Sequence, residues 1–134
     1  MTIQAIVAYA QNQIATNIAA IEYAPEYPTD KRLASKTAIA YATNMSFEPQ
    51  SGGFLLTFFD LHIQIMVPRK ELDNAMQYLA PLPEAIAAVF VADPTMGGLC
   101  QTFNGNITAN LITEVIDAMV TVGYELIIPR IKMG

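Results

Sequence analysis

Two long runs of alternating side chains, joined by a short segment rich in glycine and proline, constrain the fold more than any other feature of the sequence. In the first run, Thr37–Phe47, the odd positions are mostly bulky and the even positions are mostly alanine. In the second run, Leu55–Val67, the odd positions are apolar apart from one threonine. A period of two is typical of β-strands, because successive side chains point to opposite faces. Since Glu48–Gly53 has the composition of a turn, the runs predict one antiparallel hairpin whose second strand places its odd positions in the core.

The hairpin is long for a chain of 134 residues. When extended, the 13 residues of Leu55–Val67 span roughly 43 Å. A compact chain of this length is only about 36 Å across. We therefore expect the hairpin, about residues 35–67, to bend or to protrude as an arm. The alternative is that each run consists of two shorter strands joined at a bulge.

Helical spacing of apolar residues occurs on both sides of the hairpin. The stripe from Ile3 to Ile21 predicts an amphipathic helix, with Thr2 as its N-cap and Gln11 among the polar residues of the other faces. Pro25 and Pro28 end this helix and begin a polar loop through Arg32. A short stripe over Leu72–Leu79 and a second segment from Pro83 to about Phe90 or Ala92 predict two further helices.

The last third of the chain predicts two more strands. A short edge strand is expected at Leu99–Phe103, before the turn signal Asn104-Gly105. Ile107–Asp117 also fits helical spacing, but its β-branched residues favour a strand. Val122–Met133 is strand-like, and Pro129 predicts an edge position or a bulge. The order α-β-β-α-α-β-β predicts an α+β fold: a two-layer sandwich with an antiparallel four-stranded sheet and helices packed on one face, in a single domain spanning residues 1–134.

The charge content excludes several classes of function. Only 14 % of residues are charged, against roughly 25 % in an average soluble domain, and the net charge is −5. A nucleic-acid-binding surface needs clustered basic residues, so specific DNA or RNA binding is not expected. The longest apolar run, Ala85–Ala92, is far short of the roughly 20 residues of a membrane span. The first basic residue, Lys31, comes too late for a secretory signal. The scarcity of charge favours an obligate assembly, because monomers seldom expose large apolar patches.

The search for catalytic groups yields one candidate constellation. Asp60, His62 and Gln64 share the even face of the second hairpin strand, about 6–7 Å apart. A His–Asp pair could act as a general base, but a polar sheet face that contacts water or another subunit explains the same pattern. Cys100 is the only cysteine, and a nucleophilic cysteine needs a base beside it, so an inert buried thiol is the favoured interpretation. We therefore expect no enzymatic activity, no cofactor and no metal site.

The two Gly-Gly pairs, Gly52-Gly53 and Gly97-Gly98, lack the spacing and the lysine of a phosphate-binding loop. They are expected to be turns with positive φ. The first pair lies at the hairpin tip between two aromatic residues, and the second lies in a Pro-Gly loop beginning at Asp93. Loops and protruding tips commonly carry function on a rigid scaffold. Candidate interface residues are therefore Phe47, Gln50, Gly52, Phe54, Phe58, Asp60, His62, Asp93, Thr95 and Met96.

Two stretches carry a resemblance to a known family. The segment from Leu61 to Leu72, LHIQIMVPRKEL, looks like the strand-to-helix junction of small tail-completion proteins of long-tailed bacteriophages. The segment from Ala92 to Gly98, ADPTMGG, followed by two strands with Gly123-Tyr124, is similar to the same group. The family comprises the tail terminators and tail-to-head joining proteins. The resemblance covers roughly residues 55–133 in pattern and the whole chain in element order.

The resemblance implies a structural role in the virion, with assembly in the host cytoplasm. Members of this family are small α+β subunits that form a hexameric ring on the end of the tail tube. The ring stops tube growth and presents a surface to the head-closure or connector protein. The family has no catalytic residues. A net negative charge suits a ring through which DNA passes, because a basic lumen would hold the DNA by its phosphates. Other neck or tail-tube components, or a small host binding module or enzyme using Asp60 and His62, remain alternatives.

Overall fold

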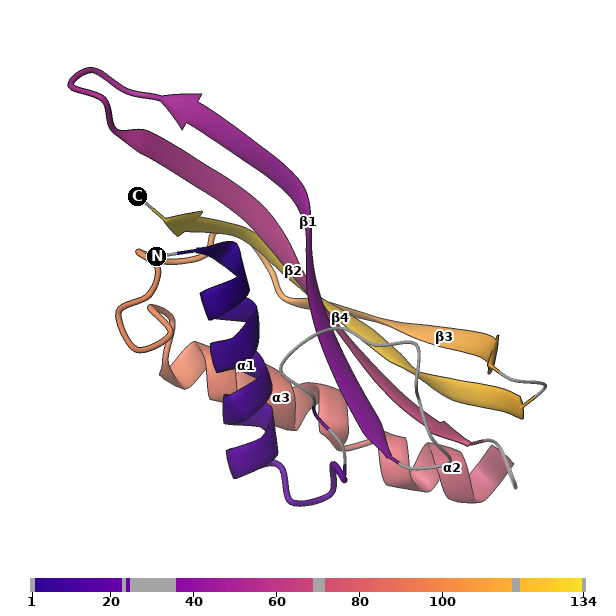
Figure 1. The fold of residues 1–134 in the computed structure, drawn as a ribbon. Helices are drawn as coiled ribbons and strands as arrows, with labels where there is room; N and C mark the ends of the chain where they lie inside the picture. Colours follow the sequence, from indigo (N-terminus) through magenta and orange to yellow (C-terminus); the bar gives the residue numbers. More distant parts are fainter. Residues whose placement is uncertain (1, 23, 25–35, 69–71, 117–118, 134) are drawn as a thin grey trace.

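The computed structural model describes residues 2–22, 24, 36–68, 72–116 and 119–133. The loop expected at Pro25–Arg32 therefore lies outside the described residues. The elements follow the predicted order (Figure 1), and their bounds are α1 Ile3–Asn17, β1 Thr37–Pro49, β2 Leu55–Pro68, α2 Leu72–Leu79, α3 Leu82–Ala92, β3 Thr108–Ile116 and β4 Met119–Met133.

The four strands form one antiparallel sheet in the order β1-β2-β4-β3. The helices lie on one face of this sheet (Figure 1), so the predicted α+β class and two-layer arrangement are confirmed. Within the segment that also fitted a helix, Ile107–Asp117, residues Thr108–Ile116 form strand β3. Its β-branched residues and its pairing with β4 over Thr108–Ile116 explain this outcome.

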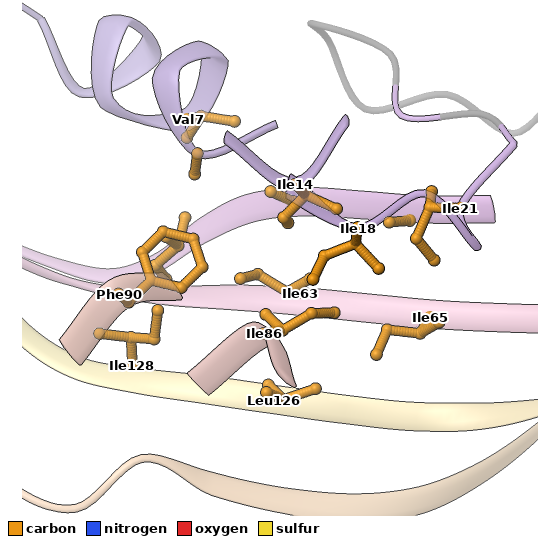
Figure 2. Close-up of a cluster of buried hydrophobic side chains, with 14 of the residues drawn as sticks. Val7, Ile14, Ile18, Ile21, Ile63, Ile65, Ile86, Phe90, Leu126 and Ile128 are labelled. Atoms are coloured by element: carbon orange, nitrogen blue, oxygen red, sulfur yellow. The ribbon is translucent and has the colours of Figure 1, made fainter. Parts of the chain in front are cut away.

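The core lies between the helices and the odd face of β2, as predicted for this strand. Ile63 and Ile65 are fully buried, and Ile86 and Phe90 of α3 and Leu126 of β4 pack around them (Figure 2). Burying one such side chain is worth about 1.5–3 kcal/mol. The sheet is therefore anchored to the helical layer along its two central strands, β2 and β4.

Helix α1 approaches the sheet closely over β1 because that strand presents alanines to it. The register pairs Ala38 with Ile65 and Ala40 with Ile63, so the small positions of β1 share the core face. Gln11 was expected on a solvated face of α1, but it is only 1 % exposed. Its Nε2 donates a hydrogen bond to the carbonyl oxygen of Ala38 at 2.9 Å. A neutral amide with a backbone partner can be buried at this contact, which explains why the expectation was wrong.

The β1–β2 hairpin extends beyond the helices and beyond the end of β4 (Figure 1). Every residue from Asn44 to Leu55 is exposed, and we call residues 44–57 the arm. The register of β1 shifts between Thr43 and Ser46, where Asn44 has a φ of 52°. Both sequence-based alternatives therefore contribute, because the hairpin protrudes and also contains a bulge.

The stretch Asn74–Ala92 covers most of α2 and all of α3. Among the described residues, this stretch is long and apolar enough, by length and composition alone, to cross a membrane. In the fold, however, it is divided at Ala80-Pro81 into two helices. Leu79, Leu82, Ile86 and Phe90 are buried in the core of the fold. The need for a packed core therefore accounts for the apolar character of one face of this stretch.

Two elements differ from the expectations. Helix α1 ends at Asn17 instead of continuing to Ile21, although Ile18 and Ile21 still pack in the core (Figure 2). The edge strand expected at Leu99–Phe103 is reduced to one isolated bridge between Thr102 and Lys132. Its backbone is occupied by turn hydrogen bonds such as that from the N–H of Cys100 to the carbonyl of Thr95 at 3.1 Å.

Pro129 lies where β4 skips a position opposite β2, since Phe59 pairs with Ile131 and Leu61 with Ile128. The predicted bulge at this proline is therefore present, although β4 is a central strand. A proline has no N–H to donate to a neighbouring strand, and a bulge removes that requirement.

Candidate functional site

A polar cluster lies on the sheet face opposite the helices. It consists of Tyr41 from β1, His62 and Gln64 from β2 and Glu125 from β4, and we call it the polar cluster. The register brings these residues together because Tyr41 pairs with His62 and Gln64 pairs with Glu125. Cross-strand partners share a face of the sheet, so the four side chains meet above the two central strands.

Glu125 is the acceptor at the centre of the polar cluster. Its Oε1 lies 2.5 Å from Nδ1 of His62, and its Oε2 accepts a hydrogen bond from Nε2 of Gln64 at 3.2 Å. The Tyr41 hydroxyl donates to Oε1 at 3.4 Å, and the Tyr41 ring stacks on the His62 ring with centroids 5.1 Å apart. Burial raises the pKa of the Glu125 carboxyl, but the hydrogen bonds from His62 and Gln64 outweigh burial and leave this pKa below its usual value.

Asp60 directs its oxygens toward Asn44 and Arg130, so the alternative in which Asp60 pairs with His62 is not the arrangement that the structure shows. One oxygen of Asp60 accepts a hydrogen bond from Nδ2 of Asn44 at 2.8 Å, and the other accepts one from the backbone N–H of Arg130 at 2.8 Å. Burial raises the pKa of Asp60, whereas these two hydrogen bonds lower it, and the net shift is downward. Asp60 therefore joins the bulges of β1 and β4 at the root of the arm.

The chemistry open to the polar cluster is limited. With Nδ1 of His62 facing Glu125, Nε2 is the nitrogen that could act as a base or ligand. The His62 side chain is only 14 % exposed. Within the described part of the chain, no three His, Cys, Asp or Glu residues are grouped to hold a metal ion. The Oε1 atom of Gln64 is buried without a hydrogen-bond partner among the described residues, so one acceptor of the cluster remains unsatisfied.

The arm is the largest exposed apolar feature near the sequence-predicted interface residues. Its large apolar side chains are substantially exposed: Met45 50 %, Phe47 54 %, Phe54 72 % and Leu55 51 %. The turn between them is closed by a hydrogen bond from the N–H of Gln50 to the carbonyl of Phe54 at 2.7 Å. Gly52 and Gly53 have φ values of 83° and 81°, as predicted for a turn that needs glycine.

Phe58 lies at the root of the arm and is only partly exposed. The Arg130 guanidinium stacks over its ring at 4.3 Å from the centroid. The cation covers one face of the ring, a favourable arrangement for an aromatic quadrupole. Phe58 and Asp60 thus fix the position of the arm, whereas Phe47 and Phe54 are available to a partner.

A cavity of about 370 Å³ opens beside the arm on the helix side of the sheet. Its lining brings two distant segments of the sequence together: Leu55 and Thr57 of the arm, Gly98–Gln101 of the loop after α3, and Met133 at the end of β4. A second cavity, of about 460 Å³, lies along α1 and shares Leu99 with the first. The polar cluster contributes no residue to either cavity.

The loop at residues 93–98 is held by its own contacts. Asp93 accepts hydrogen bonds from the Tyr9 hydroxyl at 2.6 Å and from the backbone N–H of Gly97 at 3.1 Å. These bonds hold the pKa of the Asp93 carboxyl below its usual value. Met96 is fully buried and supports the loop from inside, so its side chain is not available to a partner as proposed from the sequence. Thr95 is exposed at the loop surface.

Cys100 follows this loop and is 7 % exposed. Burial raises the pKa of its thiol, and the Asp93 carboxylate raises it further. A thiol whose pKa is raised stays protonated and is a poor nucleophile. The favoured interpretation of Cys100 as an inert residue is consistent with this environment.

A second exposed apolar patch lies at the far end of the sheet, on the β3–β4 hairpin. Leu111, Val115 and Val120 are 57 %, 69 % and 38 % exposed, and we call them the β3–β4 patch. Leu111 pairs with Tyr124 and Val115 with Val120, so the patch lies on the helix-side face of the sheet. This patch was not predicted from the sequence, although the apolar alternation within Ile107–Asp117 was the available signal.

Comparisons with models of known protein families and with curated protein sequences find no match to this chain.

Proposed function

We propose that this chain is a structural virion protein that forms a ring at the head-proximal end of a phage tail tube. The ring terminates tail assembly and joins the tail to the head connector. The observation that carries the proposal is the arm, which holds four large apolar side chains in water at a distance from the core. Such residues add nothing to the stability of the isolated chain, and they gain free energy only when a partner covers them.

The lack of an evident reaction site supports a structural role. His62 is held between Tyr41 and Glu125, and Cys100 is buried. Both cavities are lined mainly by apolar or small side chains and backbone, and among the described residues neither brings a histidine together with a carboxylate. A catalytic site needs a nucleophile, base or acid within hydrogen-bond reach of a substrate position. The described surfaces suit protein contacts better.

The charge of the chain fits a neck through which DNA passes. A net charge of −5 gives the assembled subunits no strong affinity for phosphates, so DNA would not be retained in the lumen. Partners in this role are further copies of the chain, the tail tube protein and the head-closure or connector protein. Another neck or tube component would use the same surfaces with different neighbours.

Deletion of Gln50–Gly53 tests the proposal. The deleted residues are all exposed, so thermal unfolding of the variant should match that of the parent protein. Negative-stain microscopy should show rings for the parent and few or none for the variant. Tubes assembling from tail-tube subunits should stop lengthening when the parent protein is added and should continue to lengthen when the variant is added. If the variant forms normal rings and stops tube growth normally, the role of the arm is refuted. If tubes keep lengthening in the presence of the parent protein, the proposed function is refuted.

One observation favours a second candidate function. The 2.5 Å contact between His62 and Glu125 is a carboxylate–histidine pair, which orients an imidazole for proton transfer in many enzymes. A small host enzyme or binding module that uses this pair would be a stable monomer. Light scattering on the purified protein separates this candidate from a ring-forming subunit.

A further inference from the structure

We infer that the chain assembles head to tail, with the arm of one copy seated on the β3–β4 patch of the next. The inference deepens the proposed function and rests on it, since it names the surfaces by which the ring subunits would meet. The two surfaces lie at opposite ends of the sheet (Figure 1). A contact between different surfaces of identical subunits repeats around an axis and closes into a ring when the rotation allows it.

Both surfaces are apolar on the same face of the sheet. In the arm, Phe47 pairs with Thr57, which places it on the helix-side face, and Leu55 opposite Pro49 follows the same alternation. Leu111, Val115 and Val120 also lie on the helix-side face. Among the described residues, the carboxylates of β1 and β3 next to these surfaces, Glu48 and Glu114, lie on the opposite face because Glu48 pairs with Leu56 and Glu114 with Thr121. Phe47 and Leu55 can therefore meet the β3–β4 patch without burying either carboxylate, which would be costly if unpaired. Phe54 precedes the first residue of β2 and lies in the tip of the arm.

The exposed apolar area reaches the lower limit for a specific interface when every exposed apolar side chain of the two surfaces is covered, including Phe54 at the tip of the arm. An aromatic side chain presents about 150–250 Å². Phe47 and Phe54, at 54 % and 72 % exposure, therefore present roughly 200–300 Å² together. With Met45, Leu55 and the three residues of the β3–β4 patch, the apolar total reaches roughly 600–800 Å². Since about 60 % of a typical interface is apolar, this area corresponds to roughly 1,000–1,300 Å² in total, at the threshold of a specific interface.

A two-fold contact between two arms would bury a similar apolar area, but it leaves the β3–β4 patch uncovered. A head-to-tail contact covers both apolar surfaces with one type of interface. The cavity of about 370 Å³ adjoins the arm through Leu55 and Thr57 and offers space for side chains of the neighbouring copy. Of these two arrangements, the head-to-tail one leaves less apolar surface in water.

Cross-linking between introduced cysteines tests this arrangement. The native thiol is removed with Cys100→Ala, and in that background Phe54→Cys and Val115→Cys are made singly and together. Both positions are at least two-thirds exposed, so the substitutions should leave the monomer folded, which thermal unfolding checks. A second pair, Leu55→Cys with Leu111→Cys, serves as an independent set. Each protein is treated with an oxidant or with a short bis-maleimide and separated on a denaturing gel.

The head-to-tail arrangement predicts a ladder of covalent oligomers from the double variant, ending at the number of subunits in the ring. Each single variant alone should remain monomeric on the gel, and an equimolar mixture of the two should give only dimers. Dimers from Phe54→Cys alone would overturn the inference in favour of contact between arms. Absence of a ladder from both cysteine pairs would also overturn it, whether the parent is oligomeric or monomeric by light scattering. Cross-linked rings that fail to cap tail tubes would refute the proposed function and leave the inference standing.

Discussion

The replacement Phe54→Ser separates the contribution of the arm to assembly from its contribution to folding. Phe54 is 72 % exposed, so its removal should change the free energy of unfolding by no more than about 0.5 kcal/mol. Full burial of a phenylalanine is worth about 1.5–3 kcal/mol, and covering the exposed part of this ring is worth about 1–2 kcal/mol. If each contact between subunits loses this burial free energy of about 1–2 kcal/mol, the dissociation constant for self-association increases roughly 5- to 30-fold.

Phe59→Ala is the matched control, because Phe59 lies on the same hairpin and is 1 % exposed. Removing a buried phenylalanine costs about 3–5 kcal/mol, so this variant should unfold at a much lower denaturant concentration than the parent. Urea unfolding measures stability, and sedimentation velocity over a range of concentrations measures association. The reasoning is refuted if Phe54→Ser loses as much stability as Phe59→Ala. It is equally refuted if Phe54→Ser associates with the affinity of the parent.

Three further variants test other parts of the structure. The double variant His62→Gln, Cys100→Ala should retain ring formation and tail joining, and loss of either in a folded protein would contradict the absence of chemistry at these residues. Because the native pKa of Glu125 lies below its usual value of 4.5, its stabilising effect is full above that pH and is lost as the pH falls through the native pKa. When the pH is lowered from 7 into the acid range, the free energy of unfolding, measured in urea, should therefore fall less for Glu125→Gln than for the parent protein. An equal fall in both proteins would contradict this role of Glu125. Gly123→Ala should cost more than about 4 kcal/mol, because a Cβ there would lie 1.7 Å from the carbonyl oxygen of Ile65, and an unchanged thermal midpoint would disprove this close approach.

The fold class could be predicted because local periodicity and turn composition agreed over most of the chain. The odd face of β2 is the core face, and Gly52 and Gly97 adopt the positive φ values that their turns require. The burial of Gln11 could not be predicted, because it depends on a carbonyl of β1 lying within reach of α1. Likewise, Met96 was placed in an interface from the composition of its loop, whereas tertiary packing buries it.

The polar cluster could be predicted only in part. The sequence places His62 and Gln64 on one face of a strand, because that follows from the period of two. Glu125 is 63 residues from His62 in the sequence, and its contact depends on the register of β4 against β2. A shift of one residue would turn Glu125 to the other face of the sheet. No local pattern specifies that register, so Asp60 was the only carboxylate that could be assigned to His62 from the sequence.

The direction of the arm is determined by strained backbone at its root. Asn44 and Arg130 have φ values of 52° and 48°, and the two residues donate hydrogen bonds to opposite oxygens of Asp60. Asparagine tolerates this conformation, but a residue such as arginine is held in it at a cost of about 1–2 kcal/mol. Strained residues persist when surrounding contacts hold them, and they concentrate at functional sites. The bulges joined by Asp60 therefore set the direction in which the arm leaves the sheet.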